Sequence, residues 1–208
     1  MIESIDAPEE IERAIKGWKY QAEMDTCLPT CLYNVLSEIA GRKNNYPSFM
    51  PTIEQLRQLT GHTPGGASWE EAHKGIRVEM RRKKVIEWTI ETKEDVRMDT
   101  KRLCNLVQDM NTSFPIITMG GEYIADAHSV KLSGSPHTWL SHSVVVVMCE
   151  ADSFFIFDTY NFDGKSPIKK IDRNTFEEYW ICGSPRKGVM WFEKKNLALE
   201  GFNEGDAK

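Results

Sequence analysis

Apolar residues recur every three or four positions from Cys27 to Ala40, and this stretch constrains the fold more than any other. Thr26 stands where an N-cap belongs, Pro29 falls in the first turn, where proline is tolerated, and Gly41 follows as a terminator. The pattern predicts a core-facing helix with a cysteine in its first turn. Its apolar positions are Leu28, Cys31, Leu32, Val35, Leu36 and Ile39.

Helical patterns dominate the first half of the chain and strand patterns the second half. This order predicts an α+β fold in which the helix at Cys27 packs on an antiparallel sheet. A length of 208 residues suits one domain, which we expect over residues 1–198, with 42–93 as a helical insert and 199–208 as a flexible tail. The other predicted helices span Pro8 to Lys16, Thr52 to Leu59, Trp69 to Lys83, Val96 to Asn111 and Arg173 to Trp180, and the predicted strands span Val85 to Thr92, Pro115 to Met119, Ser143 to Cys149, Phe154 to Tyr160 and Val189 to Glu193.

The charge of the chain argues against binding to nucleic acid. The formal net charge is −5, and acidic and basic residues are interspersed. Domains that bind polyanions are usually basic. The one local basic run, Arg77 to Lys84, is typical of a solvated helix face. We therefore expect no nucleic-acid partner.

The chain carries no pattern that indicates export or a membrane span. Its acidic N-terminal segment lacks the apolar region of a signal peptide. The longest apolar run, Val144 to Cys149, is far too short to cross a bilayer. Five scattered cysteines indicate reduced thiols rather than a disulfide framework. We expect a soluble cytoplasmic protein with no membrane partner.

Cys27 is a candidate nucleophile because of its place at a helix start. Backbone N–H groups and the helix dipole there favour negative charge, so they lower the pKa of a thiol. Gln21 lies six residues earlier, on a segment able to fold back beside Cys27. The Gln21 amide and the Cys27 backbone N–H could then form a two-donor oxyanion hole.

Two other interpretations of Cys27 remain open at this point. A cysteine at the start of a core helix is most often a small buried hydrophobe. Cys31 shares a helix face with Cys27, so a metal pair is conceivable, but a closed zinc site needs about four ligands. No CxxC or HxxxH spacing supplies the others. We expect no metal and no cofactor, and we interpret Cys31 as core packing.

His142 directly precedes the predicted strand Ser143 to Cys149, and Asp158 lies near the end of the next predicted strand, Phe154 to Tyr160. A charged aspartate among aromatic residues is costly without a partner, and His142 is the candidate. Pairing of Cys149 with Ser153 across a three-residue loop sets the required register. Asp158 then faces Val144 and lies diagonal to His142 on one sheet face. A loop of two or four residues would place His142 and Asp158 on opposite faces of the sheet unless a β-bulge intervenes.

Each of these residues alone also has a plain structural explanation. His142 could be a solvent-bonded histidine at a strand edge, and Asp158 an acid at a strand end. Their joint placement, together with Cys27, favours a Cys-His-Asp constellation for nucleophilic catalysis.

The pattern Gln21-x5-Cys27 at a helix start, followed by His142 before a valine-rich strand and by Asp158, resembles the papain-like superfamily, and within it the C39-like peptidase branch. The resemblance implies a papain-like fold and cleavage of a peptide or protein substrate. It implies that Cys27 is the nucleophile, His142 the general base, Asp158 the orienting acid and Gln21 the oxyanion donor. Leu28 replaces the glycine that usually follows the nucleophile.

Several other residues have no assigned role in this pattern. His128 and His137 flank a Gly/Ser-rich stretch and are interpreted as exposed loop histidines. Trp139 fits an aromatic shield over His142 or simple rim packing. The pair Gly120-Gly121 is interpreted as a turn.

Three functions fit these residues. The first is a peptidase that acts on an extended peptide. The second is an acyltransferase or amidohydrolase that uses the same chemistry on a small-molecule or thioester substrate. The third is a non-catalytic module in which the insert binds a protein partner.

Overall fold

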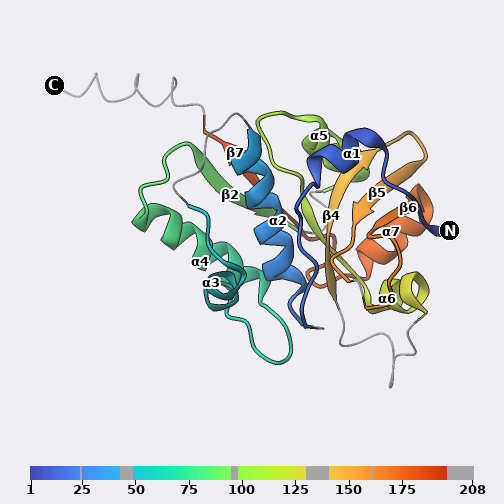
Figure 1. The fold of residues 1–208 in the computed structure, drawn as a ribbon, viewed down its shortest axis with the longest axis horizontal. Helices are drawn as coiled ribbons and strands as arrows, with labels where there is room; N and C mark the ends of the chain where they lie inside the picture. The colour runs from blue at the N-terminus through green and yellow to red at the C-terminus, as the bar shows by residue number, and fades with distance from the viewer. Residues whose placement is uncertain (24, 43–48, 95–97, 130–140, 161, 196–208) are drawn as a thin grey trace.

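The computed structural model describes residues 1–23, 25–42, 49–94, 98–129, 141–160 and 162–195. Over these residues the helices lie around one seven-stranded sheet (Figure 1). The helices are α1 (Glu9–Ala14), α2 (Cys27–Gly41), α3 (Ile53–Leu59), α4 (Trp69–Arg82), α5 (Thr100–Gln108), α6 (Gly121–His128) and α7 (Arg173–Ile181). The strands are β1 (Ile2–Ser4), β2 (Trp88–Lys93), β3 (Ile116–Met119), β4 (His142–Cys149), β5 (Ser153–Phe157), β6 (Ile168–Asp172) and β7 (Val189–Lys194).

The sheet has the strand order β1-β6-β5-β4-β3-β7-β2, and every neighbouring pair is antiparallel. The predicted α+β class with an antiparallel sheet is confirmed. The expectation of helices first and strands afterwards is incomplete, because both edge strands come from the first half of the chain. β1 pairs with β6, and β2, from the predicted insert, pairs with β7.

Helices cover both faces of the sheet, so the protein has two apolar cores. One core joins α1, α2, α3 and α4 to one face, and the other joins α5, α6 and α7 to the opposite face. In β4, Val145 and Val147 enter the first core, and Val144 and Val146 enter the second. Burial of a valine contributes about 1.5–3 kcal/mol, so this run stabilises the centre of the sheet from both sides.

The helix at Cys27 is confirmed, and α2 starts at Cys27 itself. Thr26 is the N-cap residue, but its side chain does not cap the helix. Its hydroxyl donates to the carbonyl oxygen of Glu23 at 2.9 Å, which tightens the turn before the helix. α2 packs across β4, which holds the cysteine end of the helix beside the start of that strand.

Three elements were not predicted. β1 is only three residues long, and β6 contains two lysines, of which Lys169 is buried and donates to the Ser4 hydroxyl at 2.9 Å. The interpretation of Gly120-Gly121 as a turn was wrong, because Gly120 is the N-cap of α6 and Gly121 its first residue. The predicted tail at 199–208 lies outside the described residues.

The described residues contain no helix that is both long and apolar enough to cross a membrane.

Candidate active site

A β-bulge in the hairpin of β4 and β5 sets the geometry of the candidate site. Cys149 pairs with Phe154, so the loop has four residues, and of the two arrangements that the hypothesis allows, a three-residue loop or a bulge, the structure has the bulge. The register then shifts between Val146 and Met148, which leaves Val147 as the extra residue of a bulge. Beyond the bulge the register is the one that the Cys-His-Asp hypothesis requires.

His142 and Asp158 meet as a result of that register. Nε2 of His142 lies 2.6 Å from Oδ1 of Asp158, and the two side chains are 2% and 0% exposed. Burial by itself raises the pKa of Asp158, but the charge of His142 and hydrogen bonds from His128 and His142 hold that pKa well below its usual range. Asp158 is therefore a buried carboxylate that keeps its charge.

Cys27 completes a group of three side chains with His142 and Asp158. Cys27 is partly buried, and His142 acts on the pKa of its thiol. Burial alone raises the pKa of Cys27, but the hydrogen bond and charge of His142 outweigh this effect and lower it. The pKa of His142 changes in the opposite sense: burial lowers it, while Asp158 and Cys27 raise it to about 10. A lowered pKa of Cys27 and a raised pKa of His142 favour a Cys27 thiolate beside a His142 imidazolium.

Cys31 lies one turn further along α2 in a different environment. It is fully buried, and its thiol donates to the Ser143 carbonyl oxygen at 3.2 Å. Burial and the charges of Cys27 and Asp158 raise its pKa well above the usual range. Cys31 therefore stays a neutral thiol. Over the described residues, no three His, Cys, Asp or Glu side chains gather in a way that could hold a metal ion.

Gln21 is tied to the residue that follows Asp158. Its backbone N–H donates to the Thr159 carbonyl at 3.0 Å, and its side-chain oxygen accepts from the Thr159 hydroxyl at 2.8 Å. Its amide nitrogen donates to the carbonyl of Glu23, between Gln21 and Cys27, at 3.1 Å. The end of β5 thus positions both Asp158 and the side-chain amide of Gln21, which precedes Cys27 in the chain.

Helix α6 supplies two partners of Asp158 that sequence reasoning missed. The Tyr123 hydroxyl donates to Oδ2 of Asp158 at 2.6 Å, and Nε2 of His128 lies 2.8 Å from the same oxygen. The interpretation of His128 as an exposed loop histidine was therefore wrong, because its side chain is 0% exposed. The helical spacing of Tyr123, Ile124, Ala127 and His128 is the signal that could have found α6. His137 and Trp139 lie outside the described residues.

Comparison with known proteins identifies the family. The model of the Peptidase_C39 like family matches residues 15–184, which is most of the chain. The chain belongs to the C39-like peptidase family. The resemblance predicted from the motifs around Cys27 and His142 is therefore confirmed. No curated protein matches the sequence.

Solved structures of C39-like peptidases share this fold. A Bacillus anthracis protein classed as a C39-like peptidase superposes with a TM-score of 0.58 at 12% identity, over 86% of this chain and 94% of that one. The peptidase domain of Streptococcus ComA, a bifunctional ABC transporter in a quorum-sensing pathway, gives 0.51 at 14% identity, over 85% and 97%. At these identities the likeness concerns the fold.

The predicted insert contacts the segment that leads to Cys27. Arg57 of α3 lies 3.3 and 3.0 Å from the two carboxylate oxygens of Glu23. Nε2 of His62, in the turn after α3, lies 3.2 Å from the Asp25 carbonyl oxygen and 3.4 Å from its carboxylate. The insert therefore braces the segment between Gln21 and Cys27.

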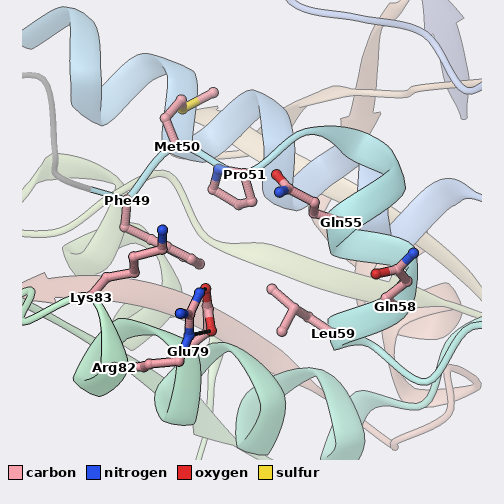
Figure 2. Close-up of a pocket in the computed structure, with 9 residues that line it drawn as sticks. All are labelled: Phe49, Met50, Pro51, Gln55, Gln58, Leu59, Glu79, Arg82 and Lys83. Atoms are coloured by element: carbon pink, nitrogen blue, oxygen red, sulfur yellow. Dashed lines mark hydrogen bonds and ion pairs between the residues drawn. The ribbon is translucent and has the colours of Figure 1, made fainter.

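A cavity of about 420 Å³ lies in the predicted insert, between α3 and α4 (Figure 2). Phe49, Pro51 and Leu59 give it apolar walls, and the ion-paired Glu79 and Arg82 line its α4 side. Its lining includes neither Cys27, His142 nor Asp158. This cavity is separate from the candidate active site.

Proposed function

We propose that the chain is a cysteine hydrolase that cleaves an amide bond in a peptide substrate through an acyl-enzyme. The observation that carries the proposal is the position of His142, whose Nε2 lies 2.6 Å from Asp158 and whose ring also lowers the pKa of Cys27. Nucleophile, base and orienting acid stand in that order in cysteine hydrolases. Membership of the C39-like peptidase family supports a peptide as the substrate class.

In the first half of the reaction, the Cys27 thiolate attacks the carbonyl carbon of the scissile bond. The carbonyl oxygen takes the negative charge and accepts hydrogen bonds from the Gln21 side-chain amide and the Cys27 backbone N–H. The imidazolium of His142 gives its proton to the leaving amine as the C–N bond breaks. The raised pKa of His142, about 10, keeps that proton available at neutral pH.

In the second half, neutral His142 takes a proton from water, and the resulting hydroxide attacks the thioester carbonyl. The C–S bond breaks, the carboxylic acid product leaves, and Cys27 returns to the thiolate beside the imidazolium. Asp158 stays ionised throughout and stabilises the charged form of His142.

Labelling with an electrophilic peptide probe, such as a peptide vinyl sulfone, tests the assignment. Wild type, Cys27→Ala and Cys31→Ala are compared, with Cys182→Ala as the control for an exposed thiol. We expect labelling of every protein except Cys27→Ala. Labelling that survives in Cys27→Ala but disappears in Cys31→Ala contradicts the proposal.

A second experiment separates hydrolysis from acyl transfer. Cleavage of a fluorogenic peptide is followed with and without an added amine acceptor, and the products are identified by mass spectrometry. We expect the free carboxylic acid as the main product in both cases. A product that carries the amine in preference to the acid would instead indicate an acyltransferase.

A further inference from the structure

His128 lies between two carboxylates at the base of the candidate site. Its Nε2 lies 2.8 Å from Oδ2 of Asp158, and its Nδ1 lies 2.7 Å from Oδ2 of Asp163. The His128 and Asp158 side chains are fully buried, and that of Asp163 is 17% exposed. Both ring nitrogens of the buried His128 therefore face carboxylate oxygens.

The two carboxylates that face His128 are both charged. Burial alone raises the pKa of each aspartate, but hydrogen bonds and nearby charges outweigh it, so both pKa values are lowered. Asp158 and Asp163 are therefore ionised, and an ionised carboxylate only accepts hydrogen bonds. A ring nitrogen of His128 that donates to one of these oxygens therefore makes a charge-assisted hydrogen bond.

Further groups face this cluster from other elements. Nζ of Lys165 lies 3.7 Å from the Asp163 carboxylate, and the charge of Lys169 on β6 also acts on Asp163. The Tyr160 ring lies 4.2 Å from the His128 ring, centre to centre. Positive charge from His142 thus acts on Asp158, and positive charge from Lys165 and Lys169 acts on Asp163, which offsets the cost of burying the carboxylates.

The carboxylate of Asp158 has all its acceptor positions filled. Oδ1 accepts from His142 at 2.6 Å and from the Tyr160 backbone N–H at 2.9 Å. Oδ2 accepts from Tyr123 at 2.6 Å and from His128 at 2.8 Å. A carboxylate has about four lone-pair sites, so four donors leave it no freedom to rotate.

We propose that His128 is a positioning residue for the reaction: anchored by Asp163, it holds Oδ2 of Asp158 so that Oδ1 stays aimed at His142. The inference rests on the proposed function of Cys27 and His142. His128 touches neither a substrate nor the reacting sulfur, and it acts through Asp158 alone. The arrangement extends the chain of contacts to Cys27, His142, Asp158, His128 and Asp163.

Two conservative variants of His128 separate its two contacts. The amide of His128→Gln reaches the place of Nε2 and can still donate to Asp158. The amide of His128→Asn reaches only the place of Nδ1, so it keeps the contact with Asp163 and loses the one with Asp158. If His128 only fills space, both variants should have similar effects. If His128 positions Asp158, only His128→Gln should retain the reactivity of Cys27.

The first readout is the rate at which iodoacetamide alkylates Cys27 at pH 6, measured by mass spectrometry of the Cys27 peptide. We expect His128→Asn to slow this rate by about tenfold or more, the usual effect of losing a hydrogen bond to a charged group, and His128→Gln to stay within about threefold of wild type. Equal rates in wild type and His128→Asn, or an equal loss in both variants, overturns the proposal. Melting temperatures show whether each variant is folded.

The second readout is the NMR signal of the His142 Nε2–H, which a short bond to a carboxylate moves far downfield. We expect this signal in wild type and His128→Gln and its loss or upfield shift in His128→Asn. An unchanged signal in His128→Asn overturns the proposal. If wild-type Cys27 reacts no faster than Cys182, the proposed function is wrong, and the NMR signal still decides whether His128 positions Asp158.

Discussion

Oδ1 of Asp158 lies 2.6 Å from Nε2 of His142, with both side chains buried between β4, the end of β5 and α6. This contact links the fold to the proposed chemistry, because the hairpin that forms the centre of the sheet also orients the histidine. Asp158 in turn takes donors from α6, so elements far apart in the sequence converge on one carboxylate.

The pKa of His142 predicts how stability depends on pH. Its value is raised from an ordinary 6.5 to about 10, so the folded protein binds the proton more tightly than the unfolded chain. The stabilisation is full below pH 6.5 and is lost as pH rises toward 10. The free energy of unfolding of wild type minus that of His142→Gln, measured in urea, should therefore shrink across this range. A difference independent of pH contradicts the raised pKa.

Asp158→Asn should slow the reaction by about 10²–10⁴-fold, as loss of the orienting acid does in other triads. The amide no longer supplies the negative charge that raises the pKa of His142, so the Cys27 thiolate is also less favoured. Rates of Cys27 alkylation and of peptide cleavage measure both effects. Asp99→Asn is the matched control, because Asp99 only caps α5 and asparagine caps equally well. A rate for Asp158→Asn as high as that of the control contradicts the assignment.

Gln21→Glu should lower kcat for peptide cleavage by about 10²–10³-fold, the usual effect of losing an oxyanion donor. Glutamate keeps an oxygen for the Thr159 hydroxyl, which donates to Gln21 at 2.8 Å, but supplies no N–H. Alkylation by iodoacetamide forms no oxyanion, so the Cys27 alkylation rate should change far less than kcat. An equal loss in both assays shows that Gln21 acts on the cysteine itself and contradicts an oxyanion role.

Arg57→Ala should lower kcat by about twofold to tenfold, because it frees the segment that precedes Cys27. The pair with Glu23 is partly exposed, at 29% and 54%, so its loss should cost only about 0.2–1 kcal/mol of stability. Arg13→Ala, which removes the exposed pair with Glu9 on α1, is the control. A change in kcat no larger than that of Arg13→Ala means that the insert does not brace the site.

Gly120→Ala should lower the free energy of unfolding by about 1–3 kcal/mol. A Cβ at Gly120 would lie 2.7 Å from that of Cys182, which forces apart α6 and the end of α7. Because α6 carries Tyr123 and His128, alkylation of Cys27 should slow as well. Gly41→Ala meets nothing within 4 Å and should be neutral or slightly stabilising. Equal melting temperatures for the two variants contradict this account.

The sequence predicted the elements whose pattern is local. α2 and the valine-rich strand β4 follow from apolar periodicity and a long apolar run, and the motifs around Cys27 and His142 gave the family. β6 was missed because its two lysines break the strand pattern, and burial of Lys169 depends on Ser4 of β1. That contact joins the start of the chain to its last third and leaves no local signal.

The candidate site shows the same limit. His142 and Asp158 can share a sheet face in two ways: with a three-residue loop, or with a four-residue loop and a bulge at Val147. Nothing in the sequence distinguishes these two arrangements. The place of His128 beside Asp158 depends on how α6 packs against the end of β5. Periodicity could have indicated a helix there, but not its partner.

Selective alkylation of Cys27 tests the central claim most directly. Wild-type protein is treated with iodoacetamide at pH 6, and modification of Cys27, Cys104 and Cys182 is followed by peptide mass spectrometry. A thiolate held by His142 should make Cys27 react at least about tenfold faster than the other two, and His142→Gln should remove the difference. Equal rates for the three cysteines in the wild type would contradict an activated nucleophile at Cys27.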